Sequence, residues 1–179
     1  MEKEIGLKDG RTVLVRDLQP NEDVIGITNF FNGLIEEKAF LVYDEKQSPE
    51  EEADWLRGQM SEIEAGRLIS WRVLLDGRHV GGVNAQQGKW KERGNVEVGI
   101  ALAKEVRGQG LGHELMSLMI EAAKEKWSPH HLFLRANPQN KAALKLYEDL
   151  GFKEFVVLKE WEDHYGEYID TVWLVLKGT

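Results

Sequence analysis

The chain has 179 residues, a formal net charge of −8 and no cysteine. This length suits one domain with a substantial core, so we expect a single domain over residues 1–179. The lack of thiols excludes disulfides, thiolate metal sites and any mechanism through an acyl-cysteine. Nucleic-acid binders usually carry basic patches, membrane spans need ~18 uninterrupted apolar residues, and residues 1–4 are charged, unlike a signal peptide. We therefore expect a cytoplasmic protein with no nucleic-acid and no membrane partner.

The first part of the chain predicts one strand and then two helices. Residues 12–16 alternate between apolar and polar side chains, as a strand does. Residues 20–34 have helical spacing, with inward positions at Val24, Ile27, Phe31 and Leu34. The run Ser48-Pro49-Glu50-Glu51 supplies the N-cap, the first-turn proline and the third-position glutamate of a capping box. The helix that it opens is expected to stop at Gly66.

A β-hairpin and a further strand follow. Residues 68–75 and 79–85 are expected to be strands around Asp76-Gly77, a pair typical of a tight hairpin turn. Residues 96–102 alternate and are rich in β-branched side chains, which predicts another strand.

A turn with three glycines separates that strand from the next helix. Residues 107–112 read Arg-Gly-Gln-Gly-Leu-Gly, and a helical stripe follows at Leu111, Leu115, Leu118, Met119 and Ala122. Glycine lets the backbone approach a ligand without a Cβ clash, and the free N–H groups at a helix start attract anions. The turn lacks the ending of a P-loop and the spacing of a dinucleotide fingerprint. It therefore predicts a phosphate or pyrophosphate site of another kind.

The last part of the chain predicts a strand, a helix and two more strands. After a strand at residues 131–136, Asn137 is expected to cap a helix that begins at Pro138 and stops at Gly151. The final strands are expected at residues 152–159 and 168–176. This order of elements predicts an α/β (α+β) fold, with a mixed, mostly antiparallel sheet, one parallel crossover and flanking helices.

Two segments resemble the GCN5-related N-acetyltransferase (GNAT) family. The glycine turn matches the family's Gln/Arg-x-x-Gly-x-Gly/Ala loop at Arg107, Gly110 and Gly112. The family's Asn-x-x-Ala-x-x-Leu-Tyr-x-x-x-Gly-Phe pattern is matched at Asn140, Ala143, Leu146, Tyr147, Gly151 and Phe152. The specific resemblance covers about residues 96–157 and implies the acyl-CoA N-acyltransferase fold.

The resemblance implies acetyl-CoA as the cofactor and a direct transfer of its acetyl group to a primary amine in a ternary complex. The pyrophosphate is expected on the glycine turn, and the pantetheine arm along the backbone of the strand before it. The implied cofactor-binding residues are Ile100, Ala101, Leu102, Arg107, Gly108, Gln109, Gly110, Leu111, Gly112, Asn140 and Tyr147. The alternatives are a tight turn without a ligand and an Asn140 that only caps its helix.

Two residues are candidates for moving protons. An amine with a pKa of ~8 to ~10.4 must lose a proton before it attacks, and Glu97 is the candidate base. At ~3.3 Å per residue it lies ~17 Å before Leu102, so a bulge or a water chain would be needed, and the alternative is a surface or structural carboxylate. Tyr147 matches the family's acid, or else is a core tyrosine. The Leu102 N–H is the implied donor to the oxygen that gains negative charge.

The acceptor is expected to be a small amine, an amino acid or a peptide or protein N-terminus. Phe31 and Asn32 are expected on one wall of its pocket, and Tyr165, between the last two strands, on the other. Packing or a homodimer contact is the alternative. His130 and His131 predict no metal site, because no third ligand is evident. The rival functions are a non-catalytic acyl-CoA sensor or adaptor of the same fold, and an acyltransferase for another acyl group or a hydroxyl acceptor.

Overall fold

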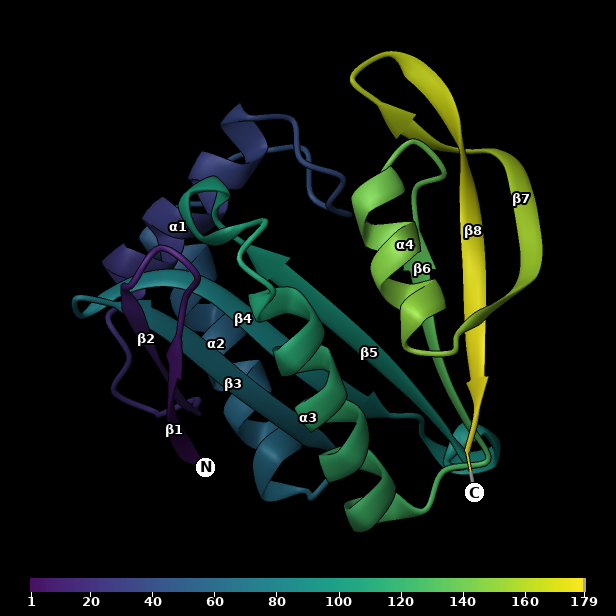
Figure 1. The fold of residues 1–179 in the computed structure, drawn as a ribbon, viewed down its shortest axis with the longest axis horizontal. Helices are drawn as coiled ribbons and strands as arrows, with labels where there is room; N and C mark the ends of the chain where they lie inside the picture. Colours follow the sequence, from purple (N-terminus) through teal and green to yellow (C-terminus); the bar gives the residue numbers. More distant parts are fainter. Residues whose placement is uncertain (179) are drawn as a thin grey trace.

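An eight-stranded sheet organises residues 1–178, the part of the chain that the computed structural model describes (Figure 1). The strands lie in the order β1-β2-β3-β4-β5-β6-β8-β7. Every neighbouring pair is antiparallel except β5 and β6, which are parallel, so the predicted fold class is confirmed. The strands are β1 (Glu2–Gly6), β2 (Thr12–Asp17), β3 (Leu68–Leu75), β4 (Arg78–Gln87), β5 (Asn95–Leu102), β6 (His131–Ala136), β7 (Lys153–His164) and β8 (Glu167–Lys177).

Helices cover both faces of the sheet. Figure 1 shows α3 and α4 on one face and α1 and α2 on the other. Val96 and Val98 of β5 are buried in the same core as Leu115 of α3, so alternation along β5 turns Glu97 and Gly99 toward the face of α1 and α2. Within residues 1–178 no helix has both the length and the apolar composition to cross a bilayer. The helices are α1 (Val24–Glu36), α2 (Pro49–Glu64), α3 (Leu111–Trp127) and α4 (Lys141–Asp149).

Strands β5 and β6 are paired over only part of their length. Their register runs from Asn95 opposite His131 to Glu97 opposite Phe133. From there the two strands diverge (Figure 1), while β5 continues to Leu102 in register with β4. Within residues 1–178, the last part of β5 therefore has a backbone edge without a neighbouring strand. Such an edge can hydrogen-bond an extended ligand.

Signals that depend on a few adjacent residues predicted the structure well. The capping box of Ser48 and Glu51 is present, and Gly66 has the left-handed φ of +73° that was expected of a helix stop. Asp76 and Gly77 also have positive φ, at 50° and 79°, as a tight hairpin turn requires.

The start of α1 was predicted too early. The helix begins at Val24 rather than at residue 20, because the Asp23 side chain accepts the Gly26 N–H at 3.0 Å and caps the helix there. Strand β1 was missed, because only Ile5 of its five residues is buried and the sequence shows no apolar alternation. It pairs with β2 at the sheet edge.

The start of α4 was also predicted too early. Asn140, and not Asn137, is the N-cap: its side-chain oxygen accepts the Ala143 N–H at 3.2 Å, so the helix begins at Lys141. The Asn137 side chain instead accepts the N–H two residues along the chain at 2.7 Å, which forms a short turn.

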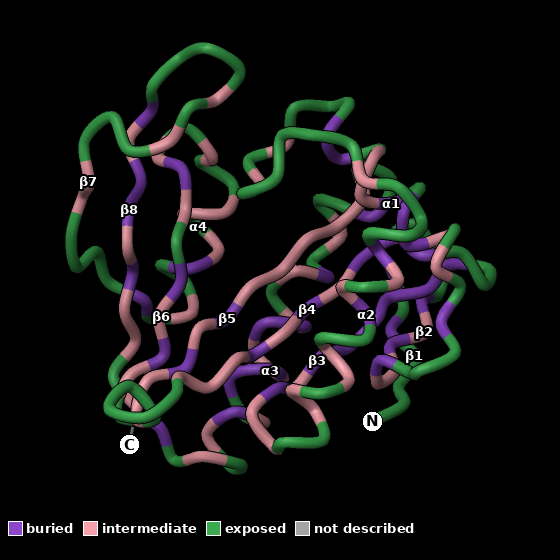
Figure 2. Tube along the Cα trace, turned by 180° about the vertical axis from the view of Figure 1, so that it is seen from behind, coloured by how far each residue is buried: buried purple, intermediate pink, exposed green. Residues whose placement is uncertain are grey.

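The aromatic-rich connection between the last strands is a hairpin rather than a loop. Strand β7 extends to His164 and β8 begins at Glu167, so the turn consists of Tyr165 and Gly166 alone. Both have positive φ, at 55° and 90°. Figure 2 shows that β7 and the hairpin tip are mostly exposed, whereas the middle of the sheet is buried.

The buried stripe of α3 gives a test of the core. Leu115 is fully buried, whereas Leu118, also predicted to face inward, lies at the margin of the core. We expect Leu115→Ala to lower the free energy of unfolding by about 2–5 kcal/mol and Leu118→Ala by clearly less, since its site can refill with water. Urea unfolding of both variants measures this. Equal losses would contradict the packing of α3.

Candidate functional site

The glycine turn presents a row of free backbone donors. Gly108 and Gly110 have left-handed φ of +73° and +86°, and Gly110 is the N-cap of α3. The flanking N–H groups of Arg107 and His113 donate to backbone carbonyls at 3.2 and 3.1 Å. Between them, the N–H groups of residues 108–112 have no hydrogen-bond acceptor among residues 1–178. Consecutive free donors at the start of a long helix favour an anion.

Two cationic side chains lie at this turn, that of Lys8 from the β1–β2 connection and that of Arg107 from the turn itself, and they point in different directions. The Lys8 Cε lies 3.7 Å from the position that a Cβ on Gly110 would occupy, and sequence analysis did not single this residue out. The Arg107 side chain is directed elsewhere: its Nε donates to the Leu102 carbonyl at 2.7 Å and its Nη1 to Glu37 at 3.2 Å. Arg107 therefore holds the turn against the end of α1, while Lys8 has no hydrogen-bond or ion-pair partner among residues 1–178 and can face an anion.

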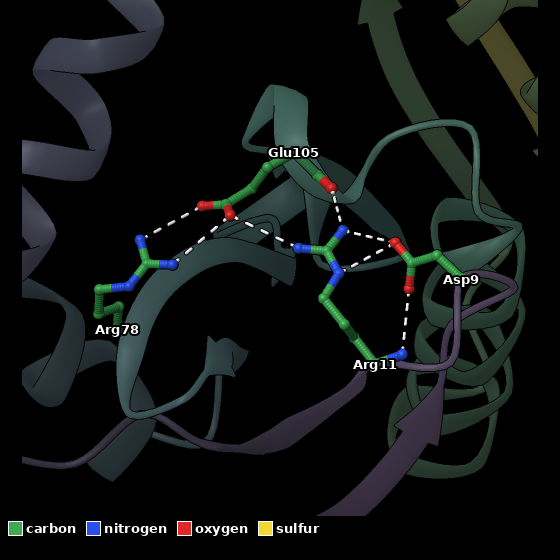
Figure 3. A network of polar contacts seen from close by, with 4 residues as sticks. All are labelled: Asp9, Arg11, Arg78 and Glu105. Atoms are coloured by element: carbon green, nitrogen blue, oxygen red, sulfur yellow. Dashed lines mark hydrogen bonds and ion pairs between the residues drawn. The ribbon is translucent and has the colours of Figure 1, made fainter.

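A polar network holds the segment that leads into the turn (Figure 3). Glu105 lies in the 3-10 turn Lys104–Val106, and its backbone carbonyl accepts from Arg11 Nη2 at 2.6 Å. Arg11 also donates to Asp9 at 2.9 Å, and Arg78 donates to the Glu105 carboxylate at 3.3 Å. The network thus fastens the β1–β2 and β3–β4 turns to the approach of the glycine turn. This is how the unpredicted strand β1 contributes to the site.

The free edge of β5 lies next to the turn. The backbone bonds from Gly88 to Asn95 at 2.9 Å and from Ala103 to Val80 at 2.8 Å fix the alternation of the β4–β5 ladder. By that alternation Ala101 bonds to β4, while the N–H and C=O groups of Ile100 and Leu102 point to the side where β6 has diverged. Arg107 occupies the Leu102 carbonyl. The N–H and C=O groups of Ile100 and the N–H of Leu102 have no partner among residues 1–178, so they can hydrogen-bond a ligand.

Tyr147 reaches this region from α4. Its side chain is buried against Phe152, with ring centroids 6.1 Å apart, and burial raises its pKa to about 12. The hydroxyl has no hydrogen-bond partner among residues 1–178, and its oxygen is not completely enclosed by the protein. Asn140 lies at the start of the same helix; its oxygen caps the helix and its NH₂ group has no partner in this part of the chain.

Glu97 lies on the opposite face of the sheet from Tyr147. Its carboxylate pairs with Arg135 of β6 at 3.0 Å, and both side chains are 39% exposed. It lines two cavities on this face, of about 420 and 390 Å³. The stacked rings of Phe133 and Trp173, 5.5 Å apart, belong to the second. Glu97 and Tyr147 can therefore serve one reaction only where β5 and β6 separate.

The 420 Å³ cavity includes one of the three residues predicted for the acceptor pocket. Phe31 lies on its wall, but Asn32 and Tyr165 do not. The Asn32 amide makes two 2.9 Å bonds to the backbone of Gln47, and so fixes the loop between α1 and α2. The Tyr165 hydroxyl donates to the Ile35 carbonyl at 3.1 Å, which joins the β7–β8 hairpin to the end of α1.

Other residues on the wall of this cavity were not predicted from the sequence. Trp55 of α2, Arg72 of β3 and Asn84 of β4 all line it. The available signal was Arg72, a lone cation in the apolar strand Leu68–Leu75. Among residues 1–178 there is no group of three His, Asp or Glu side chains that could hold a metal ion.

Comparisons with known proteins add to this geometry. The family model described as "Acetyltransferase (GNAT) family" matches residues 30–152. An N-alpha-acetyltransferase of Sulfurisphaera tokodaii is 35% identical over 78 residues, which are 41% of this chain and less than half of that protein, 46%. The L-methionine sulfoximine/L-methionine sulfone acetyltransferase of Salmonella typhimurium is 24% identical over 161 residues, covering 87% of this chain and 89% of that protein.

A solved structure gives the corresponding likeness of fold. The yncA protein of Salmonella typhimurium, solved with its cofactor acetyl-CoA, superimposes with a TM-score of 0.78 at 20% identity. The match covers 92% of this chain and 93% of that one.

Proposed function

Because the chain belongs to the acetyltransferase (GNAT) family, we propose that it transfers the acetyl group of acetyl-CoA directly to a primary amine in a ternary complex. The observation that carries this proposal is the row of free N–H groups at residues 108–112 beside the unpaired edge of β5. One feature fits a diphosphate and the other fits an extended amide chain, and acetyl-CoA contains both.

The residues around the turn fit this cofactor. The N–H groups of residues 108–112 would hold the diphosphate, with Lys8 as a nearby cation and Arg107 keeping the turn in place. Ile100 and Leu102 would bond the pantetheine arm through their backbone, and the Asn140 NH₂ group would donate to it. When bound, acetyl-CoA supplies the acetyl thioester.

Proton transfer is assigned to Glu97 and Tyr147. Glu97 would accept the proton of the amine, directly or through water, from the face that carries the 420 Å³ cavity. Tyr147 would hold a proton at its hydroxyl and donate it to the sulfur; a phenol is protonated at neutral pH already at its ordinary pKa of about 10, and burial raises the pKa of Tyr147 to about 12. The Leu102 N–H would donate to the oxygen that gains charge.

An assay of CoA release against a panel of small amines, amino acids, peptides and aminoglycosides tests the proposed activity. We expect turnover with at least one class of primary amine. Acetyl-CoA binding without turnover across the whole panel would contradict the enzyme and favour the sensor or adaptor. Turnover with another acyl-CoA, or with hydroxyl acceptors only, would identify an acyltransferase for a different acyl group or acceptor.

Glu97 gives a prediction about pH. We expect Glu97→Gln to lower kcat/KM by about 10²-fold at pH 7, and the loss to shrink as the pH approaches the pKa of the amine, because the free amine then needs no base. Rate–pH profiles of the variant and of the exposed control Glu121→Gln measure this. A loss that is the same at every pH would remove Glu97 as the base.

Location and assembly belong to the same proposal. The proposed location is the cytoplasm, and the proposed assembly is a homodimer, with a monomer as the alternative. Light scattering after size-exclusion chromatography distinguishes monomer from dimer.

A further inference from the structure

The 420 Å³ cavity contains a buried arginine that the reaction described above does not use. Arg72 of β3 is 4% exposed, and its position in the sheet is opposite Gly82 of β4, which is itself opposite Ala101 of β5. These three residues form one row across the sheet, on the face that Glu97 and Gly99 share. The row ends on the strand whose free edge is assigned to the cofactor.

The guanidinium lies over the middle strand of that row. A Cβ on Gly82 would come within 2.9 Å of Arg72 Nη1, so the absence of a side chain at Gly82 makes room for the cation. The Trp55 ring packs against its other side, 4.7 Å from Cζ to the ring centroid. Arg72 thus extends toward β5 in a fixed position and reaches about one strand spacing, ~4.8 Å, from it.

No carboxylate among residues 1–178 contacts this cation. Within residues 1–178 Arg72 has no carboxylate within 4.0 Å, and its Nε is enclosed without an acceptor. Glu22 is committed to Arg16, with bonds of 2.5 and 2.9 Å. Glu52 is buried without contacting Arg72: burial raises the pKa of its carboxyl, and the Arg72 charge, acting through space, only opposes that rise.

The unpaired cation is costly to the folded protein. A buried charge that no counterion contacts destabilises the folded protein. Burial lowers the pKa of Arg72 to about 10 against the through-space attraction of Glu22 and Glu52, and the side chain stays charged at neutral pH. A ligand that brings a carboxylate would supply the missing partner, with charge-assisted bonds in the geometry that arginine favours.

We propose that Arg72 binds the α-carboxylate of a free amino acid, and that the α-amine of this amino acid is the acetyl acceptor. This inference rests on the proposed function. An α-amino acid has its carboxylate carbon two bonds from the nitrogen, so a molecule whose carboxylate pairs with this guanidinium can present its amine on the β5 side of Gly82. The aromatic wall of Phe31, Tyr43 and Trp55 leaves an apolar space for the side chain.

The test compares the best amino acid of the panel with its own amide, which lacks the carboxylate. We expect the wild type to prefer the acid by about 10- to 100-fold in kcat/KM, as hydrogen bonds to a charged group allow. Acids and amides also differ in amine basicity, so the decisive quantity is how a substitution changes their ratio. Arg72→Met should bring the ratio near one, and Gly82→Ala, which keeps the charge but displaces it, should lower it in part.

Controls separate this inference from the proposed function. Arg57→Met removes an exposed arginine of α2 and should leave the ratio unchanged. Thermal unfolding and acetyl-CoA affinity show whether each variant is folded and loaded. If amines or peptides are acetylated while free amino acids are not, or if Arg72→Met leaves the ratio unchanged, the inference is overturned while the proposed function stands. Failure of every acceptor would instead overturn the proposed function.

Discussion

Replacing Tyr147 by phenylalanine is expected to lower kcat by about 10²- to 10³-fold and to leave acetyl-CoA affinity nearly unchanged. The residue fills a buried position that phenylalanine also fills, so packing against Phe152 persists. Its hydroxyl has no hydrogen-bond partner among residues 1–178, so its removal leaves no buried group unpaired there. What the variant loses is the proton that a phenol with a pKa raised to about 12 holds for the departing sulfur.

Steady-state kinetics together with calorimetric binding measure this effect. Tyr168→Phe is the matched control, since that residue is 67% exposed on β8 and should keep full activity. An unaltered kcat in Tyr147→Phe would assign Tyr147 to the core alone. A parallel loss of cofactor affinity would make it a binding residue rather than an acid.

Replacing Gly110 by glutamate is expected to weaken acetyl-CoA binding by at least about 100-fold, because like charges brought together cost several kcal/mol. The new carboxylate would lie at the start of α3, among the free N–H groups that we assign to the diphosphate. The left-handed φ of +86° adds about 1–2 kcal/mol of backbone strain for a residue with a side chain.

A control separates an effect at the glycine turn from the general effect of a glutamate at a left-handed position. Gly66→Glu introduces the same residue at a φ of +73°, at the end of α2 and with open space around it. It should bind acetyl-CoA normally in isothermal titration, whereas Gly110→Glu should not. Normal affinity in both variants would refute the assignment of the glycine turn.

The parts of the fold that were predictable are those with short-range causes. The capping box at Ser48 and the turn at Asp76-Gly77 are determined by adjacent residues, and they occur where expected. Strand β1 could not be predicted, because its stability comes from pairing with β2 rather than from its own pattern. The end of β7 was missed for the same reason: its exposed residues pair with β8 far from the core.

The same distinction applies to the candidate site. The glycine turn and Tyr147 lie in contiguous motifs, so the sequence alone predicted them as site residues. Lys8 could not be found, since the β1–β2 turn and α3 meet only in the folded chain. Asn32 was assigned to the pocket wall because it lies near the end of the first predicted helix, and the structure shows its amide bonded to the backbone of Gln47. The sequence shows that Arg72 is a lone cation in the apolar strand β3. It does not show that no carboxylate among residues 1–178 contacts this side chain, because that depends on the folded structure.

The central claim is that the backbone N–H groups of residues 108–112 donate hydrogen bonds to the diphosphate of the cofactor. NMR tests this claim most directly. On ¹⁵N-labelled protein, acetyl-CoA should shift the amide resonances of these five residues and slow their hydrogen exchange, since their N–H groups are free in the structure. S-acetylpantetheine, which lacks the diphosphate, should leave them nearly unchanged while shifting Ile100 and Leu102. Tight binding of acetyl-CoA with no response at residues 108–112 would contradict the account.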